Sequence, residues 1–246
     1  MSLSKYIHDE TLHRTKDAEE IIPFIIKLFN PKSVIDIGCG LGTFLQVFKK
    51  SGIDDIVGIE GAWLDRSKIV IPAENIIIAD LENDICLNRR FDLAVCLEVA
   101  EHLRIDAAET LIRSLTTHSD IIVFSAAIPH QGGQHHINEQ WIDFWQSIFR
   151  KYNYELFDLL RPALWNNKNI YWWYRQNIVV GINNSHPVDF PKQQIMNLIH
   201  PGLYLSKIEE INNLNHCLKQ IMLGEIEMEL AEEIMNNAKR NNSIDD

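Results

Sequence analysis

The chain has 246 residues, 46% of them hydrophobic, and a formal net charge of −11 at pH 7. This length and composition are enough to bury one large core. The negative charge argues against a protein that tracks along nucleic acid, because such proteins present a basic face, although a short RNA end is still compatible with it. No apolar run approaches the roughly 20 residues that a membrane helix needs, the start of the chain is too polar for a signal peptide, and the four cysteines form no CxxC pair. We therefore expect a soluble, cytoplasmic protein with reduced thiols and no membrane partner.

Segments typical of buried strands alternate with amphipathic helical segments along most of the chain. The predicted strands share short runs of β-branched and aliphatic residues; they are residues 33–37, 55–60, 75–80, 91–98, 120–127, 154–160 and 175–182. The predicted helices share apolar residues at a helical period; they are residues 16–30, 43–52, 105–119 and 138–152. Pro23 is expected to start or kink the first helix, and Gly52 to end the second. The alternation predicts an α/β fold, with a mainly parallel sheet, a last strand that pairs antiparallel, and helices on both faces.

The character of the sequence changes after Pro191, where no further strand is indicated. Apolar residues then recur at three- and four-residue spacing, as on one face of a helix; they are Ile208, Ile211, Leu214, Leu218 and Ile221. We expect this helix either to pack on the body of the protein or to pair two copies as a homodimer. The chain is thus divided into an N-terminal helical cap (1–30), a main domain (31–185) and a C-terminal helical extension (186–246).

The first predicted strand leads into a glycine-rich turn, VIDIGCGLGTF. A dinucleotide-binding turn has the pattern G-x-G-x-x-G, but Thr43 stands where its third glycine belongs. The glycines instead recur at every second position, as Gly38, Gly40 and Gly42, and an acid, Asp36, comes two residues before them. This spacing resembles motif I of the class I S-adenosylmethionine-dependent methyltransferases. That cofactor has no phosphate and needs bare backbone against its methionyl and ribose parts, with an acid near its sulfonium and amino groups.

The ends of other predicted strands strengthen the resemblance, which covers about Val34 to Ile182 and implies the Rossmann-like, seven-stranded methyltransferase sheet. It implies that Glu60 accepts both ribose hydroxyls of S-adenosylmethionine and that Asp80 accepts from the adenine amino group. The full set implied at the cofactor, with S-adenosylhomocysteine as product, is Asp36, Gly38, Cys39, Gly40, Gly42, Glu60, Gly61, Asp80, Leu81, Cys96 and Leu97. Taken singly, each acid could instead be a turn cap, a helix cap or an exposed strand end. Together, they lie where ligands bind such sheets.

A second group of polar residues, Glu98, Glu101 and His102, follows the fourth predicted strand in the run LEVAEHL. Methyl transfer is an in-line displacement, and a hydroxyl acceptor also needs a base or a metal to become nucleophilic. The spacing i, i+3, i+4 predicts that all three side chains lie on one side of a helical turn, beside the expected methyl group. Two carboxylates and an imidazole are suitable ligands for Mg²⁺ or Mn²⁺.

A further ligand is available in PHQGGQHHINEQW, which follows the next predicted strand. The runs EVAEH and HHINEQW resemble the metal site of Hen1-type RNA 2′-O-methyltransferases and of metal-binding O-methyltransferases of ubiquinone synthesis. The ligand set that this resemblance implies is Glu98, Glu101, His102 and His136, with His135 as the alternate. Without a metal, His102 or His136 is the candidate catalytic base, because imidazole titrates near neutral pH. Gly132 and Gly133 are expected to form the hinge of a lid.

An aromatic run, LWNNKNIYWWYRQN, separates the last two predicted strands. Its rings could stack on a sugar or a nucleobase, with Arg175 positioning an acid or a phosphate. We expect most of them instead to be buried in the connection between the strands. Trp141 and Trp145, four residues apart on one predicted helix, are likewise expected to lie in the core.

The sequence therefore predicts a methyltransferase that uses S-adenosylmethionine on the hydroxyl of a sugar, a glycan or another small molecule, with or without a divalent metal. As a whole it is similar to bacterial and archaeal methyltransferases of unassigned substrate, and this resemblance implies glycan or surface-polysaccharide assembly. One alternative is an RNA 3′-end 2′-O-methyltransferase, which the metal-like residues favour and the acidic charge opposes. Another is a non-catalytic, cofactor-binding scaffold that assembles through its C-terminal helix.

Overall fold

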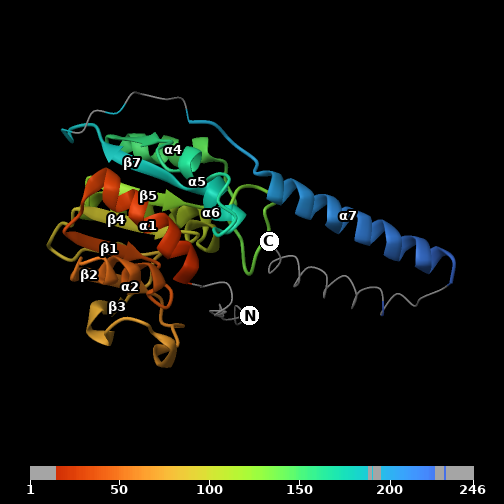
Figure 1. Ribbon diagram of the computed structural model, residues 1–246, viewed down its shortest axis with the longest axis horizontal. Helices are drawn as coiled ribbons and strands as arrows, with labels where there is room; N and C mark the ends of the chain where they lie inside the picture. The colour runs from red at the N-terminus through yellow and green to blue at the C-terminus, as the bar shows by residue number, and fades with distance from the viewer. Residues whose placement is uncertain (1–14, 188–189, 191–194, 225–229, 231–246) are drawn as a thin grey trace. The chain divides into compact units, whose positions relative to one another are not determined.

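The computed structural model describes residues 15–187, 190, 195–224 and 230 (Figure 1). The chain forms two compact units, of which the first ends at Leu198 and the second begins at Ile199. The first unit contains a central sheet with helices on both faces, and the described part of the second is one long helix.

Seven strands form a single sheet in the first unit. They are β1 (Ser33–Ile37), β2 (Asp55–Glu60), β3 (Ile76–Ile78), β4 (Leu93–Leu97), β5 (Ile121–Ser125), β6 (Tyr154–Phe157) and β7 (Val179–Asn183). Their order is β3-β2-β1-β4-β5-β7-β6, and neighbours are parallel except at β7, which runs antiparallel to both β5 and β6. The predicted fold is therefore confirmed. The order reverses between β1 and β4, and in such sheets ligands bind at this point, outside the carboxyl ends of the strands.

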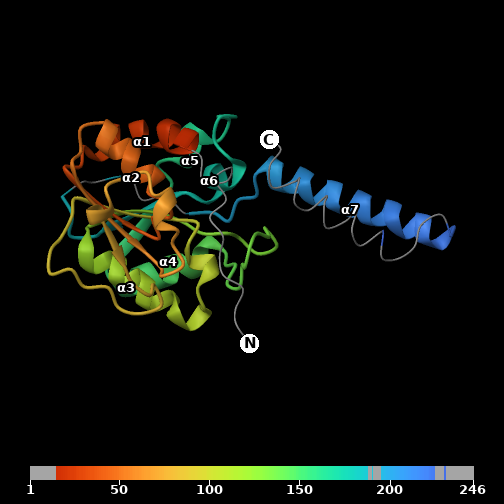
Figure 2. The same cartoon turned by 90° about the horizontal axis from the view of Figure 1, so that it is seen from below.

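Helices cover both faces of the sheet (Figure 2). The α-helices of the first unit are α1 (Thr15–Phe29), α2 (Thr43–Lys50), α3 (Ala108–His118), α4 (Ile142–Lys151), α5 (Arg161–Leu164) and α6 (Trp172–Asn177). Short 3₁₀ turns are η1 (Arg66–Lys68), η2 (Ala73–Asn75), η3 (Ala100–His102) and η4 (Ile105–Ala107). Successive residues of a strand face opposite sides, so Val34 packs in one core with α1 and α2, whereas Ile35 and Ile37 pack in the other with α3 and α4.

Of the two roles predicted for Pro23, that of a helix start is excluded, because α1 begins well before this residue and continues through it. A proline inside a helix costs about 3 kcal/mol. Ile21, Ile22 and Ile25 are fully buried, while Pro23 lies on the exposed side of the helix. Burial of three isoleucines, each contributing about 1.5–3 kcal/mol, outweighs the proline.

Several other elements are shorter than predicted, and residues 175–177, predicted as the start of a strand, belong to α6. The clearest cases are β3 and α4. β3 covers Ile76–Ile78 rather than 75–80, because it is an edge strand that pairs only with the last three residues of β2. α4 begins at Ile142 rather than at residue 138. The preceding backbone bonds elsewhere, since Asn138 N donates to the carbonyl of Glu101 at 3.1 Å and Gln140 N donates to that of Ala127 at 3.1 Å.

The second unit contains α7 (Pro201–Met222), which begins after His200. The His200 side chain caps the helix by accepting from Gly202 N at 3.0 Å. Exposed apolar side chains recur along α7 at the predicted spacing; they are Ile208, Ile211, Leu214 and Leu218. Among the described residues, none of the helices is long and apolar enough to cross a membrane.

Candidate functional site

The turn after β1 depends on three glycines in left-handed backbone conformations. Gly38, Gly40 and Gly42 have φ angles of 84°, 55° and 86°, which side chains rarely tolerate. A Cβ atom on Gly38 would also lie 2.3 Å from Cγ2 of Val99. The backbone N–H groups of Gly38 and Cys39 both donate to the carbonyl of Ile59, at 2.8 and 3.1 Å. The turn is therefore clamped between the end of β2 and the loop after β4.

Two buried carboxylates, Asp36 and Glu60, lie beneath this turn. Glu60 accepts from the backbone N–H of Gly40 at 2.8 Å and from that of Gly61 at 2.7 Å. Burial, and then the charge of Glu60, raise the pKa of Asp36 to about 8. Burial also raises the pKa of Glu60, and the hydrogen bonds from Gly61 and Gly40 oppose that shift. A cationic ligand would stabilise these two buried carboxylates. S-adenosylmethionine carries two suitable cationic groups, a sulfonium and an ammonium.

The other predicted cofactor residues lie at the same edge of the sheet or in the strands that end there. Asp80 follows β3 and is exposed, and its carboxylate accepts from Glu82 N at 3.0 Å and from the Asn83 side chain at 2.9 Å. It thus caps its own turn, and its role toward adenine stays a prediction. Leu81 is buried beside it, while Cys96 and Leu97 end β4.

Glu98 does not continue into a helical turn as the i, i+3, i+4 spacing predicted. Its φ angle is 53°, and its backbone N–H donates to both oxygens of Ser125, at 3.1 Å each. The carboxylate instead accepts from the side-chain amides of Asn177, at 3.1 and 3.2 Å, and Gln131, at 3.2 Å. The amides of Gln131, Gln176 and Asn177 also bond to one another at 2.9–3.2 Å, so they hold Glu98 in place as one amide cluster.

Glu101, His102 and His136 come together as a possible metal site, with one ligand atom from each lying within 4.8 Å of the others. Glu101 is completely buried, and neither of its carboxylate oxygens has a well-formed hydrogen bond among the described residues, although its own backbone, that of Ala127 and the Glu98 side chain lie close enough to influence its pKa. Burial, and then the charge of Glu98, raise its pKa well above the usual value. The His102 and His136 rings meet edge to face, with centroids 4.9 Å apart. Three of the four predicted ligands therefore meet; Glu98 is held beside them by the amide cluster, and the alternate, His135, is exposed.

The surroundings of each histidine bear on how its ring could bind a metal. Burial, and then the nearby His136, lower the pKa of His102 to about 4, so its imidazole is neutral at physiological pH. The Nδ1 atom of His136 lies 2.9 Å from Glu139 Oε1, which itself accepts from Gly132 N at 2.7 Å. When Nδ1 donates to this carboxylate, the lone pair on Nε2 is left to a metal, as is usual for metal-binding histidines.

The loop between β5 and α4 is shaped around His136. A Cβ atom on Gly133, whose φ is 153°, would lie 2.2 Å from Nε2 of His136, so the glycine makes room for that ring. The hinge expected at Gly132 and Gly133 stays a prediction. Glu139 was missed by the sequence analysis, although its position three residues after His136 was a usable signal. The aromatic run is mostly core, as expected, since Tyr171, Trp172 and Tyr174 are buried.

Comparison with known proteins agrees with this fold. The family model described as "Methyltransferase domain" matches residues 11–176. The crystal structure of Streptomyces venezuelae DesVI superposes with a TM-score of 0.54 at 15% identity, covering 72% of this chain and 100% of that one. The structure is also similar to the methyltransferase domain of the bacterial protein CtHen1, with a TM-score of 0.48 at 17% identity, covering 68% of this chain and 97% of that one. Magnesium protoporphyrin IX methyltransferase from Synechocystis gives a TM-score of 0.49 at 15% identity, covering 70% of this chain and 84% of that one. No curated protein matches the chain. The DesVI match supports the fold.

Gly38→Ala is expected to abolish binding of S-adenosylmethionine, measured by isothermal titration calorimetry, because the turn would be strained and the new methyl group would clash with Val99. Gly52→Ala is the matched control. Gly52 has a similar φ of 89°, but nothing lies within 4 Å of a Cβ atom there, so it should cost about 1 kcal/mol of stability and leave binding unchanged. Equal binding by both variants would contradict this assignment of the turn.

Asp36→Asn is expected to change how stability depends on pH. In the unfolded chain Asp36 loses its proton near its ordinary pKa of about 4, whereas in the folded protein it keeps the proton up to about pH 8. The folded state binds more protons between these values, so wild-type stability falls as the pH rises, by about 1.4 kcal/mol per pKa unit. Urea denaturation between about pH 5 and about pH 8 should show the wild type losing a few kcal/mol relative to the variant. If the free energies of unfolding of the wild type and the variant change with pH in the same way, burial does not raise the pKa of Asp36.

Proposed function

Because this chain belongs to the S-adenosylmethionine-dependent methyltransferases, with residues 11–176 matching the family's domain, we propose that it methylates the hydroxyl of a sugar, a glycan or another small molecule with the help of a divalent metal. One observation gives the main support for a bound metal. The carboxylate of Glu101 is fully buried with no well-formed hydrogen bond to its oxygens among the described residues, beyond weak contacts with its own and the Ala127 backbone and with Glu98, and it lies beside two histidines. A buried charge is costly unless it is paired or binds a metal.

The donor set fits such an ion. Two imidazoles and one carboxylate suit a first-row transition ion, and carboxylates also suit Mn²⁺, whereas Mg²⁺ prefers oxygen ligands alone. Of the two ions expected from the sequence, this set favours Mn²⁺. When bound, the ion would lower the pKa of the acceptor hydroxyl and so make it nucleophilic.

The residues of the chain itself hold the reactants in line. The glycine turn and its carboxylates are placed to hold the cofactor, Glu139 fixes the tautomer of His136, and the amide cluster orients Glu98. Alignment of this kind can contribute on the order of 7–11 kcal/mol to catalysis. His102 as a base without metal is the weaker alternative, because a group with a pKa of about 4 is a poor base near neutral pH; His136 stays the other candidate base.

The acceptor is proposed to be a sugar or small molecule because of charge. A net charge of −11 opposes the phosphate contacts that dominate nucleic-acid binding. RNA 3′-end methylation is the second candidate, favoured by the same group of Glu101, His102 and His136. It would require a local basic surface to receive the phosphates.

Transfer of tritium from methyl-labelled S-adenosylmethionine tests the reaction, with a panel of nucleotide sugars, oligosaccharides, quinol precursors and short RNAs. We expect transfer to a sugar or small molecule, loss of it in EDTA, and recovery with Mn²⁺ more than with Mg²⁺. Transfer that ignores EDTA would contradict the metal, and labelling of RNA alone would establish the second candidate.

Glu101→Gln should lower transfer by about 10–100-fold or more and leave cofactor binding intact. It should also raise the melting temperature of the metal-free protein near neutral pH, because it removes a carboxyl whose raised pKa makes the folded state less stable as the pH rises. His135→Asn is the matched control, since asparagine tolerates the φ of 59° at this exposed position, and it should keep full activity. Loss of transfer in His135→Asn and not in His136→Asn would show that His135, and not His136, is the metal ligand.

The exposed apolar side chains of α7 support a further part of the proposal, that this helix pairs two copies of the chain. Light scattering after size-exclusion chromatography should give twice the chain mass for the full protein and a single chain mass after truncation before Ile199. If the truncated protein still transfers the methyl group, pairing of two copies is not required for catalysis. A monomeric full-length protein would contradict the pairing.

A further inference from the structure

The ring of Trp63 packs against the backbone of Gly61, just after the end of β2. A Cβ atom on Gly61 would lie 2.2 Å from Cζ2 and 2.4 Å from Cε2 of this indole, so any larger residue at that position would displace the ring. The φ angle of Gly61 lies outside the left-handed region, which means that contact with Trp63 is what requires a glycine here. The partly exposed ring is therefore held beside Glu60.

Three hydrogen-bond donors lie at the buried carboxylate of Glu60. The backbone N–H groups of Gly40 and Gly61 donate to its two oxygens, at 2.8 and 2.7 Å. The third donor is the indole of Trp63, which lies close enough to lower the pKa of Glu60 against the effect of burial. The only polar group of an indole is its N–H, and Cε2, the carbon next to Nε1, is among the ring atoms that crowd Gly61.

These donors leave too few acceptor sites for the ribose of S-adenosylmethionine. A carboxylate has about four such sites, so about one remains, whereas the two ribose hydroxyls expected at Glu60 need two. Gly40 is fixed in the glycine turn, which is clamped to Ile59, and Gly61 follows Glu60 directly in the chain. Only the side chain of Trp63 can turn away without moving the backbone.

We propose that Trp63 is a gate to the cofactor site: its indole competes with the ribose hydroxyls for Glu60 and turns away from this carboxylate when the nucleoside binds. A ligand with a single ribose hydroxyl can use the remaining acceptor site and leave the indole in place, so the gate reads the vicinal diol. The gate also lowers the affinity for the cofactor, since only molecules with the indole turned away can bind it. This inference rests on the proposed placement of the ribose at Glu60.

The indole N–H resonance of Trp63 tests the gate directly, in a ¹H–¹⁵N spectrum of the full chain. The chain has six tryptophans, and Trp63→Phe identifies the resonance by its absence. We expect S-adenosylhomocysteine and adenosine to shift the resonance. We expect 2′-deoxyadenosine to leave it in place, at concentrations that displace labelled S-adenosylhomocysteine from the protein.

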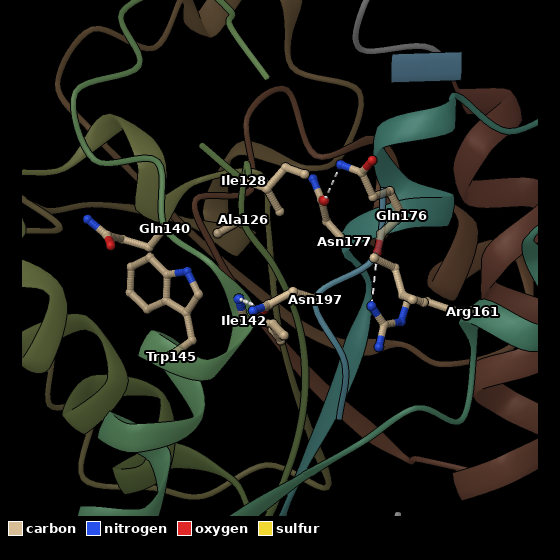
Figure 3. Close-up of a pocket in the computed structure, with 10 residues that line it drawn as sticks. Ala126, Ile128, Gln140, Ile142, Trp145, Arg161, Gln176, Asn177 and Asn197 are labelled. Atoms are coloured by element: carbon tan, nitrogen blue, oxygen red, sulfur yellow. Dashed lines mark hydrogen bonds between the residues drawn. The ribbon is translucent and has the colours of Figure 1, made fainter. Parts of the chain in front are cut away.

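Trp145 supplies an internal reference in the same spectra. Its buried ring lines a small cavity formed by residues of α4, α5, α6 and the segments next to them (Figure 3). No residue of β2 or of the glycine turn lines this cavity. The Trp145 resonance should therefore stay in place with all three ligands.

Calorimetry on Trp63→Phe tests the competition, because phenylalanine keeps a ring against Gly61 and removes the N–H. We expect this variant to bind S-adenosylhomocysteine about threefold to tenfold more tightly than the wild type, as removal of one competing hydrogen bond predicts. Trp165→Phe is the matched control. Trp165 is partly buried at the end of α5, which follows β6 at the far edge of the sheet from β2, so its replacement should leave the affinity unchanged.

The other outcomes overturn the gate in distinct ways. An equal shift of the Trp63 resonance with 2′-deoxyadenosine would show that the indole does not respond to the diol. An unshifted resonance with S-adenosylhomocysteine bound would show that the indole stays at Glu60. Equal or weaker binding by Trp63→Phe would show that the indole does not compete with the ribose.

Transfer assays separate this inference from the proposed function. Methyl transfer by a wild type that fails the tests above would keep the proposed function and overturn the gate. A shift of the Trp63 resonance without transfer to any acceptor would leave the gate standing and contradict the proposed reaction. A wild type that does not bind S-adenosylhomocysteine would contradict both. Trp63→Phe should lower the KM for S-adenosylmethionine and leave the KM for the acceptor unchanged.

Discussion

The site depends on one constraint, which is that several carboxyl groups lie wholly or partly buried at one edge of the sheet. Glu60 is satisfied by backbone N–H groups and Glu98 by side-chain amides. Asp36 is left to retain its proton, and neither carboxylate oxygen of Glu101 has a well-formed hydrogen bond among the described residues. Glu60 and Glu98 hold the neighbouring backbone and loops in place through their hydrogen bonds. Asp36 and Glu101 would be stabilised as carboxylates by a bound positive charge. A sulfonium cofactor and a divalent ion are the two cations that a metal-assisted methyltransferase would supply.

The parts of the fold that were predicted well are those set by local pattern. β1 and β2 were predicted with their observed ends, because each is a buried run bounded by glycine, proline or a charged residue. The errors arose where contacts from distant parts of the chain outweigh local preference. α1 tolerates Pro23 because its other face is buried, and residues 138–141 stay extended because their backbone bonds to the loops after β4 and β5.

The same division holds for the site. The glycine turn could be predicted because left-handed backbone demands glycine at fixed positions, and the histidine loop could be predicted because of its residue types. The amide cluster could not, since Asn177 reaches Glu98 across 79 positions of the sequence and no local pattern marks such a pair.

The raised pKa of Asp36 has a consequence for turnover. Methyl transfer converts a positively charged sulfonium into a neutral thioether, so the charge that favours the ionised carboxylate disappears within the catalytic cycle. If the cofactor binds beside Asp36, as we propose, loss of the positive charge lets this carboxyl take up a proton again, so the site would favour the cofactor over S-adenosylhomocysteine. This preference would weaken as the solution becomes more acidic, because the carboxyl of the cofactor-bound protein then takes up its proton as well.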